Sequence, residues 1–125
     1  MRRTIELKNG AVTLESNAAT PLIAKRIFKI DYFSFLDGDE TVGDKTTAVM
    51  KLAFVMAKQA EVAAKFSGTS ERLNALFQLK DDDFLAWSSE FEFDEMLNTI
   101  VPTAIEVWTG SNATNSEPKN QQGQQ

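Results

Sequence analysis

Apolar and polar residues alternate near the start of the chain, between residues 4 and 15. Alternation with a period of two is typical of a half-buried strand, and the central Asn9-Gly10 dipeptide is the one best suited to a type I′ turn. The pattern predicts a β-hairpin over about residues 4–15. Because a hairpin alone is only marginally stable, its apolar face is expected to lie on the helices that follow. The apolar positions of this face are Ile5, Leu7, Val12 and Leu14.

From residue 21 onwards, the apolar positions recur with the helical period. The longest such segment covers residues 46–66 and has apolar residues around most of its circumference. The hydroxyl of Thr20 followed by Pro21 predicts the N-cap and first residue of a shorter helix that reaches about Ile30. Pro102 predicts a kink in the last helix because it lacks a backbone N–H. Three further helices are expected to begin near Ser70, Asp81 and Asp94.

The helical pattern ends at Trp108. Residues 109–125 contain no large apolar side chain and are rich in Ser, Asn, Thr, Gly and Gln. Such a segment cannot bury enough surface to offset the entropy that ordering would cost. We therefore expect a small, mainly α-helical domain over residues 1–108 with an N-terminal β-hairpin, followed by a disordered polar tail over residues 109–125.

Composition excludes several classes of function. The 125 residues include no histidine and no cysteine, which excludes Ser-His-Asp and Cys-His catalysis and the zinc sites built on these side chains. Neither glycine-rich phosphate-binding signature occurs. The acidic run Asp81–Asp83 stands directly before an apolar-periodic helix, which favours helix capping over magnesium binding. We expect no cofactor, no metal and no enzymatic activity, although an enzyme that uses only Asp, Glu and Lys stays an open alternative.

Charge and hydropathy bear on the partners and the location. The formal net charge is −5 and the sequence pI is about 4.7, so the chain lacks the basic surface that nucleic-acid binding requires. No apolar run approaches the length of a membrane span, and polar residues follow the first three residues where a signal peptide would be apolar. We expect a cytoplasmic protein that binds neither nucleic acid nor membrane.

Aromatic residues are the candidates for contact with a partner. Nine phenylalanines and two tryptophans are many for so short a folded portion. Phe54 projects onto the lysine-marked side of the long helix, and Phe91 and Phe93 cannot both face the same helical core. We expect Phe54 and one ring of the Phe91/Phe93 pair to contact a partner. The other interpretation of Phe54 is that it packs under a neighbouring loop.

Four segments in a fixed order carry a resemblance to a known family. After the predicted hairpin come Pro21–Ile23, Lys51–Ala57, Asp81–Trp87 and Ile100–Trp108, and the polar segment follows. In this order the chain resembles the tail assembly chaperones of long-tailed (siphovirus-type) bacteriophages that infect Gram-positive bacteria. The likeness covers almost the whole chain. It implies a mainly helical, non-enzymatic protein.

The resemblance also implies a role and a set of partners. Proteins of this family coat the tape measure protein, keep it soluble, and leave as tail tube subunits polymerise around it. The implied partners are the tape measure protein, further copies of the chain in a ring or spiral, and a longer form of the same protein made by −1 frameshifting. The implied location is the host cytoplasm, and the mature virion is not expected to contain the protein.

Frameshifting can be traced to one position. Pro118-Lys119-Asn120 stands a few residues before the end of the chain. If its codons are CCA AAA AAC, they contain the slippery sequence A AAA AAC, on which both tRNAs can re-pair one nucleotide back. Lys119 and Asn120 are therefore the expected frameshift position, and the gene sequence tests this directly.

A small acidic phage or bacterial regulator is the alternative from another class. Residues 71–79 and 82–91 can be interpreted as a helix-turn-helix, but the second helix would present carboxylates to the DNA phosphates. A regulator of this composition would therefore act by binding protein or by mimicking DNA. The dispersal of the carboxylates among thirteen Lys and Arg residues argues against mimicry.

Overall fold

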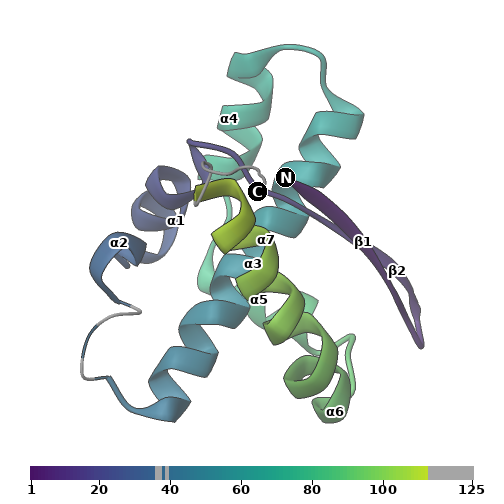
Figure 1. The fold of residues 1–125 in the computed structure, drawn as a ribbon. Coiled ribbons are helices and arrows are strands. Elements are labelled where there is room, and N and C mark those ends of the chain that lie inside the picture. The colour runs from purple at the N-terminus through teal and green to yellow at the C-terminus, as the bar shows by residue number, and fades with distance from the viewer. Residues whose placement is uncertain (36–37, 39, 113–125) are drawn as a thin grey trace, which may run out of the picture.

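The computed structural model describes residues 1–35, 38 and 40–112, which form a mainly helical protein with an N-terminal antiparallel hairpin (Figure 1). This confirms the predicted fold class. The elements follow one another along the chain as β1 (Arg2–Leu7), β2 (Gly10–Glu15), α1 (Thr20–Phe28), α2 (Tyr32–Phe35), α3 (Val42–Lys65), α4 (Thr69–Phe77), α5 (Asp81–Ser88), α6 (Phe93–Glu95), the π-helix η1 (Met96–Ile100) and α7 (Val101–Asn112).

Helix α3 is the centre of the core. The side chains from Ala48 to Ala60 are buried, except for the half-buried Lys51 and Lys58. A helix that is apolar on almost every side must be surrounded, and here β2, α1, α4, α5 and α7 all pack against it. In Figure 1 the hairpin lies on one side of α3, and α1 and α2 lie on the other. The helix begins four residues before the predicted start because Thr41 caps it, its hydroxyl accepting from Asp44 N at 3.1 Å.

The hairpin forms where it was predicted, but its turn is of another kind. The register pairs Leu7 with Gly10, which leaves Lys8 and Asn9 as the two loop residues. A type I′ turn requires positive φ at both central residues. Neither Lys8 nor Asn9 has positive φ, whereas Gly10 has a φ of 128°. The prediction of a type I′ turn at Asn9-Gly10 is therefore wrong, and glycine supplies the unusual backbone conformation one position after the loop.

Helix α1 begins and ends differently from the prediction. Ala19 is the N-cap, and the Thr20 hydroxyl instead donates to Gln59 Oε1 at 2.7 Å, which ties α1 to α3. At the other end, Lys29 adopts a left-handed conformation with a φ of 62°, and its N–H bonds to Lys25 O. This closes the helix at Phe28, two residues before the expected end.

The last helical segment continues past its predicted end. The irregularity expected at Pro102 lies in the preceding turn, where η1 is a π-helix and Val101 N–H bonds to Met96 O. A wider turn removes the clash between a proline ring and the carbonyl four residues earlier. Helix α7 then runs to Asn112, so it takes in residues 109–112 of the segment predicted as a tail. Residues 113–125, which include Lys119 and Asn120, lie outside the described residues.

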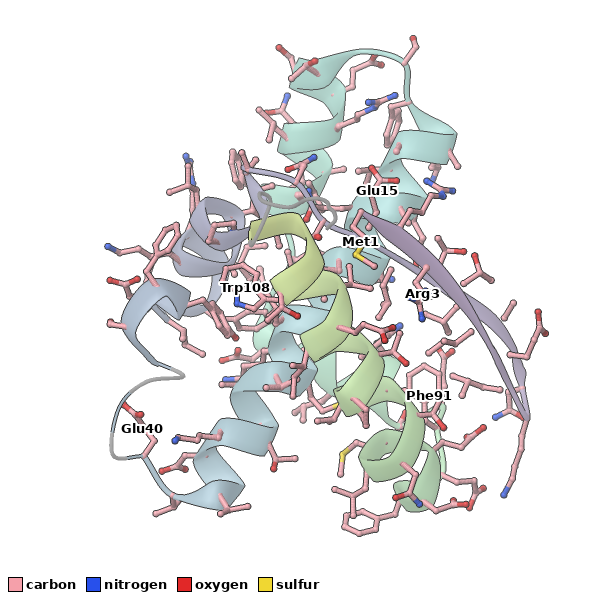
Figure 2. All side chains as sticks on the ribbon, in the orientation of Figure 1. Met1, Arg3, Glu15, Glu40, Phe91 and Trp108 are labelled. Carbon is pink, nitrogen blue, oxygen red and sulfur yellow. The ribbon has the colours of Figure 1, made fainter. Side chains whose placement is uncertain are left out.

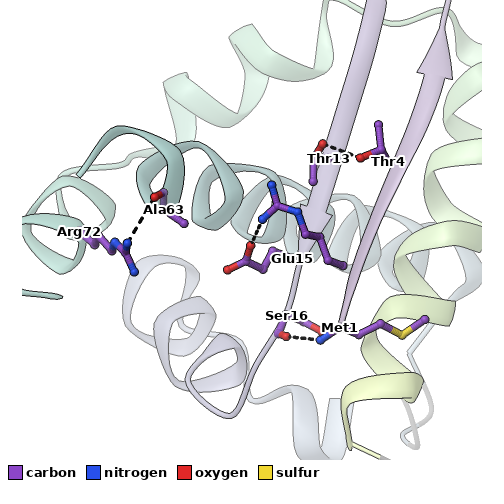
Figure 3. A network of polar contacts seen from close by, with 8 residues as sticks. Met1, Thr4, Thr13, Glu15, Ser16, Ala63 and Arg72 are labelled. Carbon is purple, nitrogen blue, oxygen red and sulfur yellow. Dashed lines mark hydrogen bonds and ion pairs between the residues drawn. The ribbon is translucent and has the colours of Figure 1, made fainter. Parts of the chain in front are cut away.

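The first residue of the chain holds the hairpin to the end of α7. Met1 and Ser16 exchange two backbone hydrogen bonds of 2.8 Å (Figure 3). Ser16 Oγ donates to Val107 O at 3.1 Å. Gly110, in the last turns of α7, lies so close to Met1 that a Cβ there would come within 2.1 Å of the Met1 sulfur. Glycine therefore permits a close approach of the Met1 side chain to α7, and a larger residue at this position would require that side chain to shift.

Glu95 holds the other end of the hairpin. Its buried carboxylate accepts the Lys8 backbone N–H at Oε2 (2.7 Å) and the Glu92 N–H at Oε1 (2.9 Å). Asn9 Nδ2 adds a hydrogen bond to Glu90 O at 2.7 Å. The hydrogen bond from the Glu92 N–H, followed by that from Lys8, lowers the pKa of the Glu95 carboxyl below its ordinary value of 4.5.

The lowered pKa of Glu95 predicts a specific dependence of stability on pH. The folded state releases the Glu95 proton more readily than the unfolded state, so the contribution is fully present above pH 4.5 and is lost as the pH falls through the folded-state pKa. A Glu95→Gln variant is expected to be less stable at neutral pH and to lose less stability on acidification. Urea unfolding between neutral pH and pH 3 measures the stability of the variant and its change with pH. Glu90→Gln is the control. Parallel pH profiles for wild type and Glu95→Gln would contradict the prediction.

Candidate protein-binding groove

An apolar groove of about 410 Å³ lies between the N-terminal half of α3, helix α5, and the segment from the end of α5 into η1. Its walls combine aromatic rings, two methionines and a few small polar side chains. The lining residues are Thr46, Thr47, Met50, Phe84, Leu85, Ser88, Phe91, Glu92, Phe93 and Met96. The groove therefore joins residues from parts of the sequence that are about fifty positions apart.

Helix α5 forms one wall because its two large aromatic residues anchor it to the core. Asp83 Oδ2 accepts the Lys80 backbone N–H at 2.9 Å and fixes the start of the helix. Phe84 and Trp87 are buried against α3. With these side chains pointing inward, Leu85 points away from the core and keeps 61% of its surface exposed.

Phe91 and Phe93 both line the groove, and they differ in exposure. The half-buried Phe91 ring packs edge-on against Trp87, with 4.8 Å between the centroids (Figure 2 labels Phe91). Phe93 opens α6 and is 72% exposed. One ring of the pair is thus left at the surface, as the sequence predicts, and both line the same groove. Their role in binding a partner stays a prediction.

Phe54 is not part of this surface. Its exposed fraction is 0%, and its ring lies among the rings of three other aromatic residues at centroid distances of 5.6–6.0 Å. The expectation that Phe54 is exposed is wrong, because α1 and α5 cover the side of α3 that a helical projection leaves open. The lysine that follows one turn later, Lys58, lies over the same ring at 5.6 Å. The surrounding residues are Phe28, Phe84 and Trp87.

The chemistry of the groove favours an apolar occupant. Glu92 is the one charged residue among those that line it, and the Ser88 hydroxyl oxygen is buried without a hydrogen-bond partner. Such a surface can bury the apolar face of a peptide helix but offers no nucleophile with an activating base. Within the described part of the chain, no cluster of His, Cys, Asp or Glu has a geometry suited to a metal ion. None of the described helices is long and apolar enough to cross a membrane.

A second hollow, of about 520 Å³, lies between the hairpin, α3 and α5, and it differs in character. Charged side chains line it from both sides, and Lys58 Nζ pairs with Glu61 within it at 3.3 Å. Its mixture of positive and negative groups favours neither a cation nor an anion. The other charged residues in its lining are Arg2 and Glu90.

The spacing of the aromatic residues predicted the two phenylalanines of the groove but not its other walls. Leu85 gave a signal, because it is a large apolar residue one position away from the Phe84–Trp87 face of a short helix. Met50 and Met96 gave none, because each is an apolar residue in a helical pattern that predicts core packing, and each reaches the groove only through tertiary packing. No family model, no curated protein and no solved structure matches the chain.

Proposed function

We propose that the protein is a non-enzymatic adaptor that binds apolar helices, and that it serves as a tail assembly chaperone for a phage tape measure protein. The observation that supports the binding role is the apolar groove, with Leu85 and Phe93 exposed at its edge. Large exposed apolar side chains around a hollow are typical of protein interaction sites. The resemblance described above supports the choice of partner.

The groove suits a helix better than a small ligand. Its rings and methionines can receive the side chains that a helix projects at intervals of three and four residues. Methionine side chains adapt to varied apolar surfaces, which suits a partner that presents many different sequences along its length. A long helical protein would be held by many copies of the adaptor, each making a weak contact.

The remaining features of the proposal rest on the net charge and on the resemblance to the tail assembly chaperones. The net charge of −5 keeps a protein with exposed apolar surface soluble in the host cytoplasm. The chain is the short product of a −1 frameshifted gene pair, acts together with its longer form, and leaves before the virion is complete. It self-associates and binds neither nucleic acid nor membrane.

A groove variant tests the proposal directly. Phe93→Ala is expected to weaken binding to the co-expressed tape measure protein of the same phage by about thirtyfold, because exposed aromatic anchors contribute about 2 kcal/mol or more in an interface. Its unfolding free energy should change by less than about 0.5 kcal/mol, because the ring is mostly in solvent. Affinity co-purification and chemical unfolding measure the two effects.

The matched control for this experiment is Leu22→Ala. Leu22 is an exposed apolar residue on α1 and is not among the residues that line the groove. The Leu22→Ala variant should leave both binding and folding unchanged. Full binding by a folded Phe93→Ala variant would remove the groove from the proposal. Failure of the wild-type chain to retain the tape measure protein, with capture of a transcription factor instead, would favour the regulator.

A further inference from the structure

Strand β1 has an open edge. Among the described residues the sheet consists of two strands, so each strand has one edge without a strand partner. β2 packs against α3, whereas β1 contacts α7, where Arg3 pairs with Glu106. Within the described residues, no other segment pairs with β1. Four of its six residues are exposed, and only Ile5 and Leu7 are partly buried. An unpaired strand edge is a template for pairing with another strand.

The pattern of hydrogen bonds identifies which groups face the open edge. Met1 and Ser16 exchange both backbone hydrogen bonds, and in an antiparallel ladder such pairs alternate with pairs that exchange none. Residues 3, 5 and 7 therefore bond to β2. The backbone groups that point outward belong to Arg2, Thr4 and Glu6. Lys8 continues this series, but its N–H already donates to Glu95 Oε2 at 2.7 Å, so the open stretch ends at Glu6.

This edge is complementary to itself in one register. When two copies of β1 meet antiparallel about a twofold axis at Thr4, Arg2 of each copy stands opposite Glu6 of the other. Opposite charges directly across a ladder are favourable, and like charges are not. A shift of the strand register by two residues in one direction would place Arg2 opposite Lys8, which carries the same charge. A shift in the other direction would pair Arg2 with Thr4 and leave Glu6 without a partner strand.

The side chains on this face already form rows that a second copy would extend. Thr4 Oγ1 and Thr13 Oγ1 are 2.8 Å apart, and Arg2 forms an ion pair with Glu15 (Figure 3). In the twofold arrangement the threonine row continues across four strands. Each Arg2 guanidinium then lies between Glu15 of its own chain and Glu6 of the second copy, which distributes its donors over two carboxylates.

We propose that the protein dimerises by pairing the β1 edges of two copies, giving a four-stranded antiparallel sheet with its twofold axis at Thr4. The interface uses backbone groups of Arg2, Thr4 and Glu6 and two symmetric Arg2–Glu6 pairs. The interface is separate from the apolar groove and does not depend on the function proposed for it. A β1-edge dimer is a unit from which larger assemblies can be built, since the groove of each copy stays open.

Cysteine cross-linking tests the register, because the chain has no cysteine of its own. In the proposed dimer, the two Thr4 Cα atoms lie about 5.5 Å apart, which is within the range of a disulfide. Thr4→Cys should therefore form a disulfide-linked dimer on mild oxidation. Glu6→Cys should not, because its two copies lie about 13 Å apart along the strands. Thr13→Cys, on the inner strand of the same face, is the second control.

A charge exchange tests the same interface without cysteine. Glu6→Arg alone places like charges opposite each other twice and should raise the dimer dissociation constant about tenfold. Arg2→Glu alone should do the same. A mixture of the two variants restores complementary pairs and should form the heterodimer with near wild-type affinity. Sedimentation equilibrium measures the dimer dissociation constant of each variant and of their mixture. Circular dichroism checks that the variants are folded, and Glu90→Arg is the control for the change in net charge.

Three results would overturn the proposal. One is a wild-type chain that stays monomeric at millimolar concentration. The second is equal cross-linking of the Thr4→Cys and Thr13→Cys variants, which would show that collision rather than a fixed register brings the sulfurs together. Loss of dimer in both single-charge variants, without recovery in their mixture, would also reject the twofold register.

Discussion

Phe54→Ala is expected to lose about 3–5 kcal/mol of unfolding free energy, as replacement of a fully buried phenylalanine usually does. The ring is at the centre of an aromatic cluster, with centroid distances of 6.0 Å to Phe28, 5.8 Å to Phe84 and 5.6 Å to Trp87. The interplanar angles of 61°, 70° and 59° are those of edge-to-face or tilted pairs, which add to the stabilisation from buried area. Because a small domain has about 5–15 kcal/mol of stability in all, this loss would leave the variant close to unfolding.

Phe93→Ala is the matched control for this variant, because the same atoms are removed from a ring that is mostly in solvent. Chemical unfolding followed by circular dichroism compares the two. A large loss of unfolding free energy for Phe54→Ala and almost none for Phe93→Ala would show that burial, rather than residue type, decides the loss of stability. Equal stability of Phe54→Ala and wild type would place Phe54 outside the core and contradict its packing among the other aromatic rings.

Trp108→Ala is expected to lose a similar amount, about 3–5 kcal/mol, for a different structural reason. Trp108 is 8% exposed and lies near the end of α7, where its ring faces Tyr32 at 6.1 Å and Phe33 at 6.4 Å (Figure 2). It therefore fastens the short helix α2 to the last helix. Tyr32 is buried and its hydroxyl donates to Ala48 O, so α2 is held from both α7 and α3.

Ile105→Ala is the control within the same helix, since Ile105 is 42% exposed. Thermal unfolding of both variants gives the difference in stability. Hydrogen exchange adds a local test, because removal of the Trp108 ring should reduce protection of α2 before it reduces protection of α3. Unchanged unfolding of Trp108→Ala would move this residue from the core to the surface and leave α2 without an anchor on α7.

The Phe54→Ala and Trp108→Ala variants test which aromatic residues build the core. The other aromatic residues are available to bind a partner. Most of the rings are used internally, as expected for a small domain with few positions from which to build a core. Phe93 differs because α6 begins at the surface and no later element covers it. The proposed binding role therefore rests on Phe93 and its neighbours in the groove, and it no longer involves Phe54.

The sequence was sufficient for the elements whose signals are local. The alternation around Asn9-Gly10 predicted the hairpin, and the long apolar period predicted the central helix, because residue spacing alone decides which side chains share a face. Predictions from local sequence failed where a side chain bonds to a group far away in the sequence instead of to its own helix. Thr20 was expected to cap its own helix, but its hydroxyl bonds to Gln59 of α3, thirty-nine positions away.

The groove could be predicted only in part, for the same physical reason. The pair Phe91 and Phe93 signalled an exposed ring, since residues two apart on a short helical segment point in different directions. Which ring is exposed depends on whether Trp87 is near enough to cover it, and the sequence does not contain that distance. The open edge of β1 could not be predicted from the sequence at all, because the direction of each backbone group follows from the observed pairing of Met1 with Ser16.

The sequence by itself determined that this protein is a small, acidic, mainly helical chain with a hairpin at its start and no histidine or cysteine chemistry. These properties depend on composition and on spacing along the chain. Only the tertiary structure decided that Phe54 is buried, that Glu95 holds the hairpin loop, and that Met50 and Met96 meet Phe93 in one groove. Burial and contact depend on what neighbouring elements cover, and that coverage is set by the packing of all the helices around α3.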